Sequence, residues 1–143
     1  MFTGSHRVRV DEKGRLAIPA GFRKQLPEGS FVSVGLDRVL AIYPPEVWAA
    51  LADELRAPLQ GPDQRALART LYSLSGSFEP DGQGRITLTA ESRRAAAIEA
   101  PSTAVVIGSG SRVEIWPEAR WNSYSADAQD RFTEFADRVI SGH

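Results

Sequence analysis

Two arginines in this chain, Arg15 and Arg85, each close a turn pattern that begins with an aspartate four residues earlier. The guanidinium group of arginine is a rigid, charged fork whose donors match two phosphate oxygens or the O6 and N7 atoms of guanine. Asp11 and Asp81 can each reach across the turn and fix the direction of that fork. Two exposed cations of this kind predict an anionic partner such as nucleic acid.

The same residues also have a purely structural interpretation. An Asp–Arg ion pair across a tight turn can simply hold the loop closed at the surface and contribute little else. For a single copy the two interpretations are equally good. The repetition of the pattern and the basic residues around the first copy favour the binding interpretation.

The turn belongs to a longer internal repeat. Residues 11–18 and 81–88 both contain Asp, then Gly three residues later, then Arg, then apolar residues one and three positions further on. The residues that follow also correspond, as Ala20, Arg23 and Lys24 with Ala90, Arg93 and Arg94, and as Ile42-Tyr43-Pro44 and Trp48 with Ile115-Trp116-Pro117 and Trp121. An internal repeat indicates one structural unit that is built twice.

Each turn requires particular elements to position it. Residues 5–10 alternate between basic and apolar side chains, which is typical of a half-buried strand, and Gly14 suits the left-handed backbone of a tight turn. The first copy therefore predicts a β-hairpin, a short helix after Pro19, and strands at 31–35 and 39–43. The second copy predicts strands at 77–79, 85–89, 105–108 and 113–116 and a short helix at 93–98. Further helices are expected at 47–55, from an Asp63 cap onward, and from Pro117 to the end.

The repeat sets the expected domain organisation. We assign residues 5–50 and 75–122 to the two copies, 51–74 to a helical linker with a break near Pro58, and 123–143 to a C-terminal helix. One copy alone would leave strand edges open and an apolar face uncovered. Two copies can interleave their strands, so the sequence predicts a mainly β protein with helices, in which the repeats form one pseudo-twofold barrel that displays both turns.

The aromatic residues outside the turns suggest packing roles. Trp48, Trp116 and Trp121 lie at strand ends and on helices, which favours core packing over base stacking. Phe132, Phe135, Ala136 and Val139 form an apolar stripe opposite acidic residues. That stripe either packs on its own sheet or forms part of a subunit interface, and the sequence leaves both open.

Composition restricts the class of protein. A chain of 143 residues corresponds to about one domain, and 42% hydrophobic residues can form a core. The net charge of -1 is not that of a uniformly basic protein, but residues 5–26 hold six basic and two acidic residues. The absence of cysteine excludes disulfides and thiolate metal sites, and fits a cytoplasmic location. The chain contains no apolar run of membrane-spanning length, and its polar N-terminus does not resemble a signal peptide.

Catalysis has little support in the sequence. The two histidines, His6 and His143, stand at opposite ends of the sequence, so they do not form a closely spaced pair of metal ligands. The serines at 73, 75 and 77 lack a nucleophile-elbow pattern, and no Lys-Ser/Thr pair follows Gly84 as a phosphate loop would require. We therefore expect no enzyme activity, no metal and no cofactor.

The basic side chains near the turns form the predicted binding site. Lys13 and Gln83 occupy the same position in the two copies, where Lys suits phosphate or guanine and Gln suits adenine or phosphate. Residues of second rank, expected to position phosphates without reading bases, are Arg7, Arg9, Arg23, Lys24, Arg93 and Arg94. For Arg7 and Arg9 a solvated strand face is an equal alternative, and for Arg93 and Arg94 local pairing with Glu91 and Glu99 is favoured.

The doubled pattern resembles the swapped-hairpin fold of AbrB and SpoVT, and specifically the MraZ family of bacterial regulators, which has two such units in one chain. The resemblance rests on Met1-Phe2-x-Gly4, on Asp11-x-Lys13-Gly14-Arg15-Leu16-x-Ile18-Pro19, on Asp81-x-x-Gly84-Arg85-Ile86, and on the Ile115-Trp116-Pro117 and Trp121 ending. It implies a nucleoid-associated regulator of a cell-division and cell-wall gene cluster. Such a protein binds repeated boxes of double-stranded DNA near its own promoter and assembles into rings.

A protein-interaction module is the remaining alternative. AbrB-like domains also resemble antitoxins, which bind DNA and a partner protein. A second full copy argues against that interpretation, whereas the acidic helical tail keeps it open.

Overall fold

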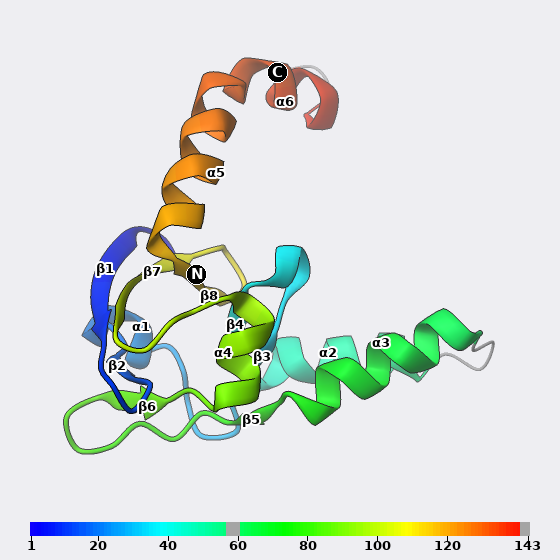
Figure 1. The fold of residues 1–143 in the computed structure, drawn as a ribbon. Coiled ribbons are helices and arrows are strands. Elements are labelled where there is room, and N and C mark those ends of the chain that lie inside the picture. The colour runs from blue at the N-terminus through cyan, green and yellow to red at the C-terminus, as the bar shows by residue number, and fades with distance from the viewer. Residues whose placement is uncertain (57–60, 141–143) are drawn as a thin grey trace.

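The computed structural model describes residues 1–56 and 61–140. The first repeat contains β1 (Ser5–Val10), β2 (Arg15–Ala17), α1 (Ala20–Arg23), β3 (Phe31–Val34), the short 3₁₀ turn η1 (Leu36–Arg38) and β4 (Leu40–Tyr43). The second repeat contains β5 (Gly76–Ser77), β6 (Arg85–Thr87), α4 (Ala90–Ala96), β7 (Ser102–Gly108) and β8 (Val113–Pro117). Helices α2 (Pro45–Leu55) and α3 (Pro62–Ser73) connect the repeats, and α5 (Glu118–Asp130) and α6 (Phe132–Val139) follow the second (Figure 1).

Within the described residues, the two repeats pair with each other through four pairs of strands, while β3–β4 and β7–β8 pair within a repeat. One antiparallel sheet has the order β1-β7-β8-β4-β3-β5, and β2 pairs with β6 in a separate two-stranded ribbon. The pairs β1–β7, β4–β8, β3–β5 and β2–β6 each join one repeat to the other. Each repeat therefore completes the sheet of its counterpart, as the open edges of a single copy require.

The predicted local hairpin of the first repeat is wrong. The turn itself closes, since the Asp11 amide donates to the Arg15 carbonyl at 2.9 Å and the Gly14 amide donates to the Asp11 carbonyl at 3.0 Å. Beyond the turn, however, β1 pairs with β7 and β2 pairs with β6. Pairing with the other repeat buries Leu16 against Ile86, and a local hairpin would not provide that contact.

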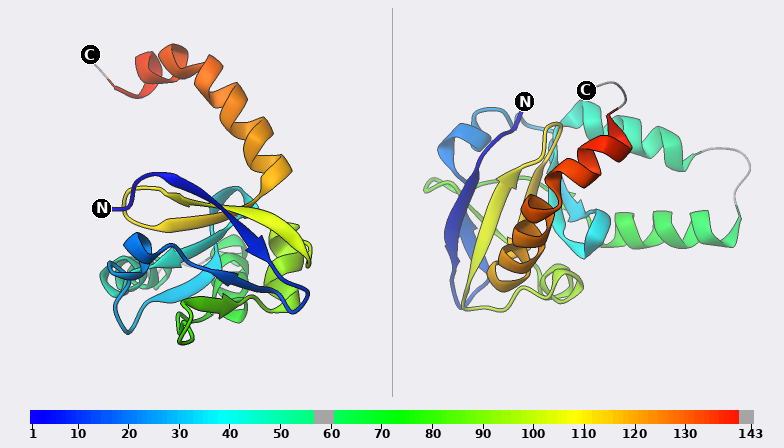
Figure 2. Two further views of the ribbon diagram at one scale, coloured as in Figure 1. Left: turned by 90° about the vertical axis from the view of Figure 1, so that its left-hand side faces the viewer. Right: turned by 90° about the horizontal axis from the view of Figure 1, so that it is seen from above.

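The expected closed barrel is not what the described strands form. The six-stranded sheet has β1 and β5 as its two ends, and among the described residues these two strands do not pair. The fold is thus an open antiparallel sheet with a short ribbon and helices (Figure 2).

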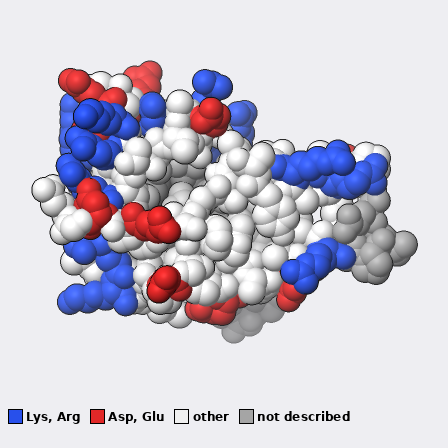
Figure 3. All heavy atoms as spheres, turned by 90° about the horizontal axis from the view of Figure 1, so that it is seen from below, with Lys and Arg blue, Asp and Glu red and all other residues white. Residues whose placement is uncertain are grey.

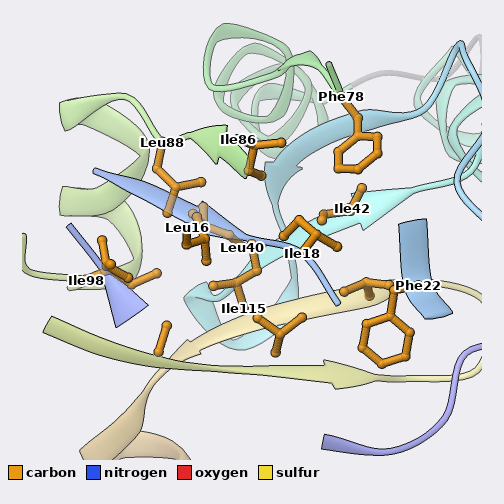
Figure 4. Close-up of a cluster of buried hydrophobic side chains, with 14 of the residues drawn as sticks. Leu16, Ile18, Phe22, Leu40, Ile42, Phe78, Ile86, Leu88, Ile98 and Ile115 are labelled. Atoms are coloured by element: carbon orange, nitrogen blue, oxygen red, sulfur yellow. The ribbon is translucent and has the colours of Figure 1, made fainter. Parts of the chain in front are cut away.

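The core lies where the ribbon covers the sheet. The apolar residues that follow each turn arginine, Leu16 and Ile18 in one repeat and Ile86 and Leu88 in the other, are at most 6% exposed. They converge on Leu40, Ile42 and Ile115 of the large sheet (Figure 4). Burial of an aliphatic side chain of this size contributes about 1.5–3 kcal/mol, so the same residues that shape the turns also anchor them.

Helices α2 and α3 extend from the sheet as a pair (Figures 1 and 2). Trp48 stacks on Phe31 at 5.0 Å and meets Tyr72 edge-on at 5.9 Å, which supports its predicted packing role. Helix α3 begins after Gly61 with Pro62, rather than at an Asp63 cap. The break predicted near Pro58 lies outside the described residues.

The C-terminal region forms two helices instead of the single one expected. Trp116, Trp121 and Tyr124 pack together at the base of α5, with centroids 4.8 to 6.3 Å apart. At Arg131 the backbone leaves helical geometry, and α6 then turns away at the far end of α5 (Figure 2). Phe132 and Val139 remain 71% and 79% exposed, so the apolar stripe does not pack on its own sheet.

Within the described ranges, none of the helices combines the length and apolarity needed to cross a membrane.

Candidate nucleic-acid interface

The first turn, residues 11–15, is hereafter called tip one. Its centre is the Asp11 carboxylate, whose Oδ1 accepts hydrogen bonds from the amides of Lys13 and Arg15, both at 2.9 Å. The other oxygen, Oδ2, accepts from Nε of Arg15 at 2.7 Å. Gly14 adopts a φ of 80°, which few side chains tolerate. One carboxylate therefore shapes the loop and also orients the guanidinium.

Tip two, residues 81–85, repeats this arrangement with different intervening side chains. Asp81 Oδ1 accepts from the amides of Gln83 and Arg85 at 2.8 and 3.0 Å, and Oδ2 accepts from Nε of Arg85 at 3.0 Å. Gly84 has a φ of 75°. Because only Asp, Gly and Arg are common to both tips, these three residue types are sufficient for the geometry.

Both carboxylates are held in the charged form. The hydrogen bond from the Arg15 backbone amide has the largest effect and lowers the pKa of Asp11. Burial opposes it, and the Arg15 guanidinium and the Lys13 amide lower the pKa further. In tip two, the backbone amides of Arg85 and Gln83 lower the pKa of Asp81. Each arginine is therefore oriented by a permanent negative charge at neutral pH.

The β2–β6 ribbon places both arginines on one face. In its register Leu16 lies opposite Ile86, Arg15 opposite Thr87, and Arg85 opposite Ala17. Because side chains alternate along a strand, Leu16 and Ile86 face the core while the two arginines share the outer face. Two residues of strand separate their positions by roughly 7 Å along the ribbon.

The guanidinium groups remain accessible on that face. The side chains of Arg15 and Arg85 are 35% and 31% exposed. In the described part of the chain, each is hydrogen-bonded through its side chain only by Nε, so both terminal nitrogens have no partner. The ribbon therefore presents two oriented cations with unused donors.

Some of the other basic residues lie beside tip one, and others are exposed on the elements that follow the ribbon strands. Arg9 and Lys13 are exposed and line a shallow hollow together with Arg15. Figure 3 shows Lys and Arg side chains along the left edge, the side on which β1, β2 and β6 lie in Figure 1, with acidic groups among them. Gln83 is exposed at tip two, and Lys24 and Arg94 are exposed on the helical segments that follow the ribbon strands.

The comparison with known proteins adds a family. A family model described as "MraZ protein, putative antitoxin-like" matches residues 1–70 and 75–141. The chain belongs to the MraZ family. It is 38% identical over 143 residues to "Transcriptional regulator MraZ" of Salinispora tropica, with 99% of each chain covered. The protein of the same name from Heliobacterium modesticaldum is 41% identical over 141 residues, covering 98% of this chain and 97% of the relative. That of Nocardia farcinica is 41% identical over 143 residues, with 99% of each covered.

In this MraZ-family chain, Arg7, one of the predicted binding residues, contacts the C-terminal helix α5. Arg7 is exposed, but its Nε pairs with Glu118 at 2.9 Å and its Nη2 donates to Asn122 at 2.8 Å. These contacts join β1 to the first turns of α5. Arg7 therefore points toward the C-terminal helix, whereas Arg9 lies beside tip one.

Arg23 and Arg93 occupy a place that the sequence did not predict. Both are partly buried, and each lies against the glycine of the tip in the other repeat. The signal available in the sequence was their equivalent position in the two copies, but nothing local indicated that the contact crosses between repeats.

Metal ligands are not grouped in the described part of the chain, where no three His, Asp or Glu side chains converge.

Proposed function

We propose that this MraZ-family chain is a sequence-specific, DNA-binding transcriptional regulator, and that Arg15 and Arg85 contact the duplex. The observation that carries the proposal is the outer face of the β2–β6 ribbon, where two carboxylate-oriented guanidinium groups share one face and, among the described residues, have terminal donors without a partner. The curated relatives named transcriptional regulators support it. Their names denote regulators and not enzymes, which fits a protein without catalytic activity.

The chemistry follows from the arrangement of donors. A two-stranded ribbon is of a size that the major groove of B-DNA admits, and a terminal arginine fork matches guanine or a pair of phosphate oxygens there. The carboxylate already fixes Nε of each arginine, so little side-chain freedom is lost on binding. Lys13 and Gln83 give the two tips different chemistry. Arg9, Lys24 and Arg94 supply phosphate contacts around them.

The proposal includes the wider organisation of the protein. We assign residues 5–50 and 75–122 to two AbrB-like, swapped-hairpin repeats, joined by a helical linker at 51–74 and followed by a C-terminal segment at 123–143. We also assign the protein to the cytoplasm and nucleoid. Its targets are repeated DNA boxes upstream of a division and cell-wall gene cluster.

Self-association into a ring is part of the same proposal. The exposed Phe132 and Val139 on α6 provide an apolar surface that a second copy can cover. Linking several weak sites raises the affinity for several DNA boxes by orders of magnitude when their spacing fits. Sedimentation velocity of the purified chain tests this self-association and gives the number of subunits.

An antitoxin-like or scaffold protein is the second candidate. It is favoured by the name of the matching family, "MraZ protein, putative antitoxin-like", and by the exposed apolar side chains of Phe132 and Val139 on α6. Such a protein would retain α6-dependent protein binding without preference for a DNA sequence.

The deciding experiment is a titration of the purified chain with DNA from upstream of its own gene. The regulator predicts retention of this DNA over a shuffled duplex, with affinity that falls steeply as salt rises. Arg15→Ala combined with Arg85→Ala should abolish the preference. Arg56→Ala combined with Arg69→Ala is a matched control that also removes two positive charges, since both arginines are exposed on the α2 and α3 pair and Arg56 lies 3.7 Å from Asp53. Equal binding to both duplexes, or equal losses for the two sets of variants, would refute the proposal.

A further inference from the structure

The tips are held together across the repeats at their glycines. The carbonyl of Gly84 in tip two accepts a hydrogen bond from the Ile18 amide of the first repeat at 3.0 Å. Reciprocally, the carbonyl of Gly14 in tip one accepts from the Leu88 amide of the second repeat at 2.9 Å. Each tip is therefore bonded through its glycine to the strand that follows the other tip.

An arginine side chain covers each of these glycines. A Cβ atom built on Gly84 would lie 2.6 Å from both Nε and Cζ of Arg23, and one built on Gly14 would lie 2.9 Å from Nε of Arg93. At these spacings the arginine side chain would have to shift to admit a Cβ atom, and at Gly14 the Leu88 carbonyl oxygen would also be too close at 2.9 Å. The guanidinium of Arg23 is thus packed on tip two, and that of Arg93 on tip one, so that each repeat contacts the tip of the other.

The immediate surroundings of these arginines direct them inward. Nε of Arg23 donates to the Ile18 carbonyl at 2.8 Å, which fixes the side chain beneath tip two. Nε of Arg93 is buried and has no hydrogen-bond partner within the described residues. In both cases this part of the side chain faces protein, unlike the exposed neighbours Lys24 and Arg94.

We propose that Arg23 and Arg93 are positioning residues that act through the opposite tip: Arg93 sets the orientation of Arg15, and Arg23 sets that of Arg85. The inference rests on the DNA-binding function proposed above and deepens it. DNA binding by either tip then requires an intact residue of the other repeat. The two repeats consequently read DNA as one coupled unit.

Double-mutant cycles distinguish positioning from direct contact. If Arg93 acts through tip one, the effects of Arg93→Met and Arg15→Ala on DNA affinity are not independent. The loss of affinity in the double variant is then smaller, by a factor of about three or more, than the product of the two single losses. The same Arg93→Met change combined with Arg85→Ala, in its own repeat, gives the simple product. A direct phosphate contact by Arg93 predicts simple products with both, and that result would overturn the proposal.

Matched controls separate positioning from loss of charge. Arg94→Met removes the same charge from the adjacent, exposed position of α4 and should couple to neither tip. Arg93→Lys retains the charge but loses the planar group that lies on Gly14, so it should not restore binding if Arg93 positions tip one. Full recovery with lysine would instead identify a charge contact and refute the positioning role. For tip two, Arg23→Met is the corresponding test variant, and Lys24→Met at the adjacent, exposed position is its charge control.

A measurement without DNA makes the two proposals independent. In spectra of the free, folded protein, Arg93→Met should shift the backbone amide resonances of residues 11–15 and leave those of 81–85 unchanged, and Arg23→Met should do the reverse. Unchanged resonances in the opposite tip would overturn the cross-repeat contact, whatever the DNA result. If the wild-type protein binds no specific DNA, the proposed function fails, and these spectra alone decide whether the arginines position the tips.

Discussion

Substitution of Gly84 by alanine tests the geometry of the tips through stability. Gly84 has a φ of 75°, and an alanine in this left-handed conformation costs about 1–2 kcal/mol. The new Cβ would lie 2.6 Å from the Arg23 guanidinium, which must move and lose its 2.8 Å hydrogen bond to the Ile18 carbonyl. That bond contributes about 1 kcal/mol. The expected loss is about 2–3 kcal/mol, or a fall in Tm of roughly 4–12 °C for a chain of this size.

The same loop supplies the matched control. Gly82 lies two residues earlier, its φ is outside the left-handed range, and a Cβ built there would meet no heavy atom within 4 Å. Its counterpart in tip one is Glu12, so a side chain fits this position. Gly82→Ala should change the free energy of unfolding by less than about 0.5 kcal/mol. Thermal unfolding followed by circular dichroism measures both variants, and identical melting temperatures would refute the reasoning about Gly84 and Arg23.

Three further predictions concern charged groups. Arg15→Ala should reduce DNA affinity by about 5- to 100-fold, because one base-reading arginine is lost. The Tm of this variant should be nearly unchanged. A large loss of stability with normal DNA binding would instead show that the arginine has a structural role. The pKa of Asp11 is lower in the folded state than in the unfolded chain. Its charge therefore stabilises the fold at a pH above the unfolded-state pKa, and this stabilisation is lost as the pH falls through the folded-state pKa. The difference in Tm between wild type and Asp11→Asn should therefore narrow on acidification from about pH 5 to about pH 2, and a constant difference would contradict the assignment. A double-mutant cycle of Arg7→Ala and Glu118→Ala should give a coupling of less than about 1 kcal/mol at low salt that fades in 1 M salt, and salt-independent coupling would show that the 2.9 Å pair is not a surface contact.

Features determined by near neighbours in the chain could be predicted closely. Asp11 bonds to groups two and four residues away, so its spacing to Lys13 and Arg15 already contains the geometry of tip one. The strands at 31–34 and 40–43 follow from short apolar runs between turns. The family resemblance, confirmed by the family model, also rested on such local motifs repeated in order.

Two of the incorrect predictions, the local hairpin and the closed barrel, concern partners that are distant in sequence. A β-hairpin at residues 5–18 was reasonable because two alternating segments flank a tight turn, but strand alternation does not specify which strand is the partner. Likewise, the apolar stripe on α6 predicts a buried face without saying what covers it. The break at Arg131 was not predicted, because no proline or glycine marks it in the sequence. Asp127 and Glu134, which pair with Arg131 on either side of the break, are also residues that occur within ordinary helices.

The amino-acid sequence alone determined that two equivalent tips exist, that each holds an arginine by an aspartate, and that each requires a glycine, because these contacts span at most five residues. The tertiary structure decided that β2 pairs with β6, which places Arg15 and Arg85 on one face, and that Arg23 and Arg93 lie on each other's tips. The physical reason is that the repeats carry nearly equivalent apolar patterns, so each strand has a suitable partner in either copy. The pairing between copies buries Leu16 and Ile86 in one core between the ribbon and the sheet, and this shared burial favours it over pairing within a copy.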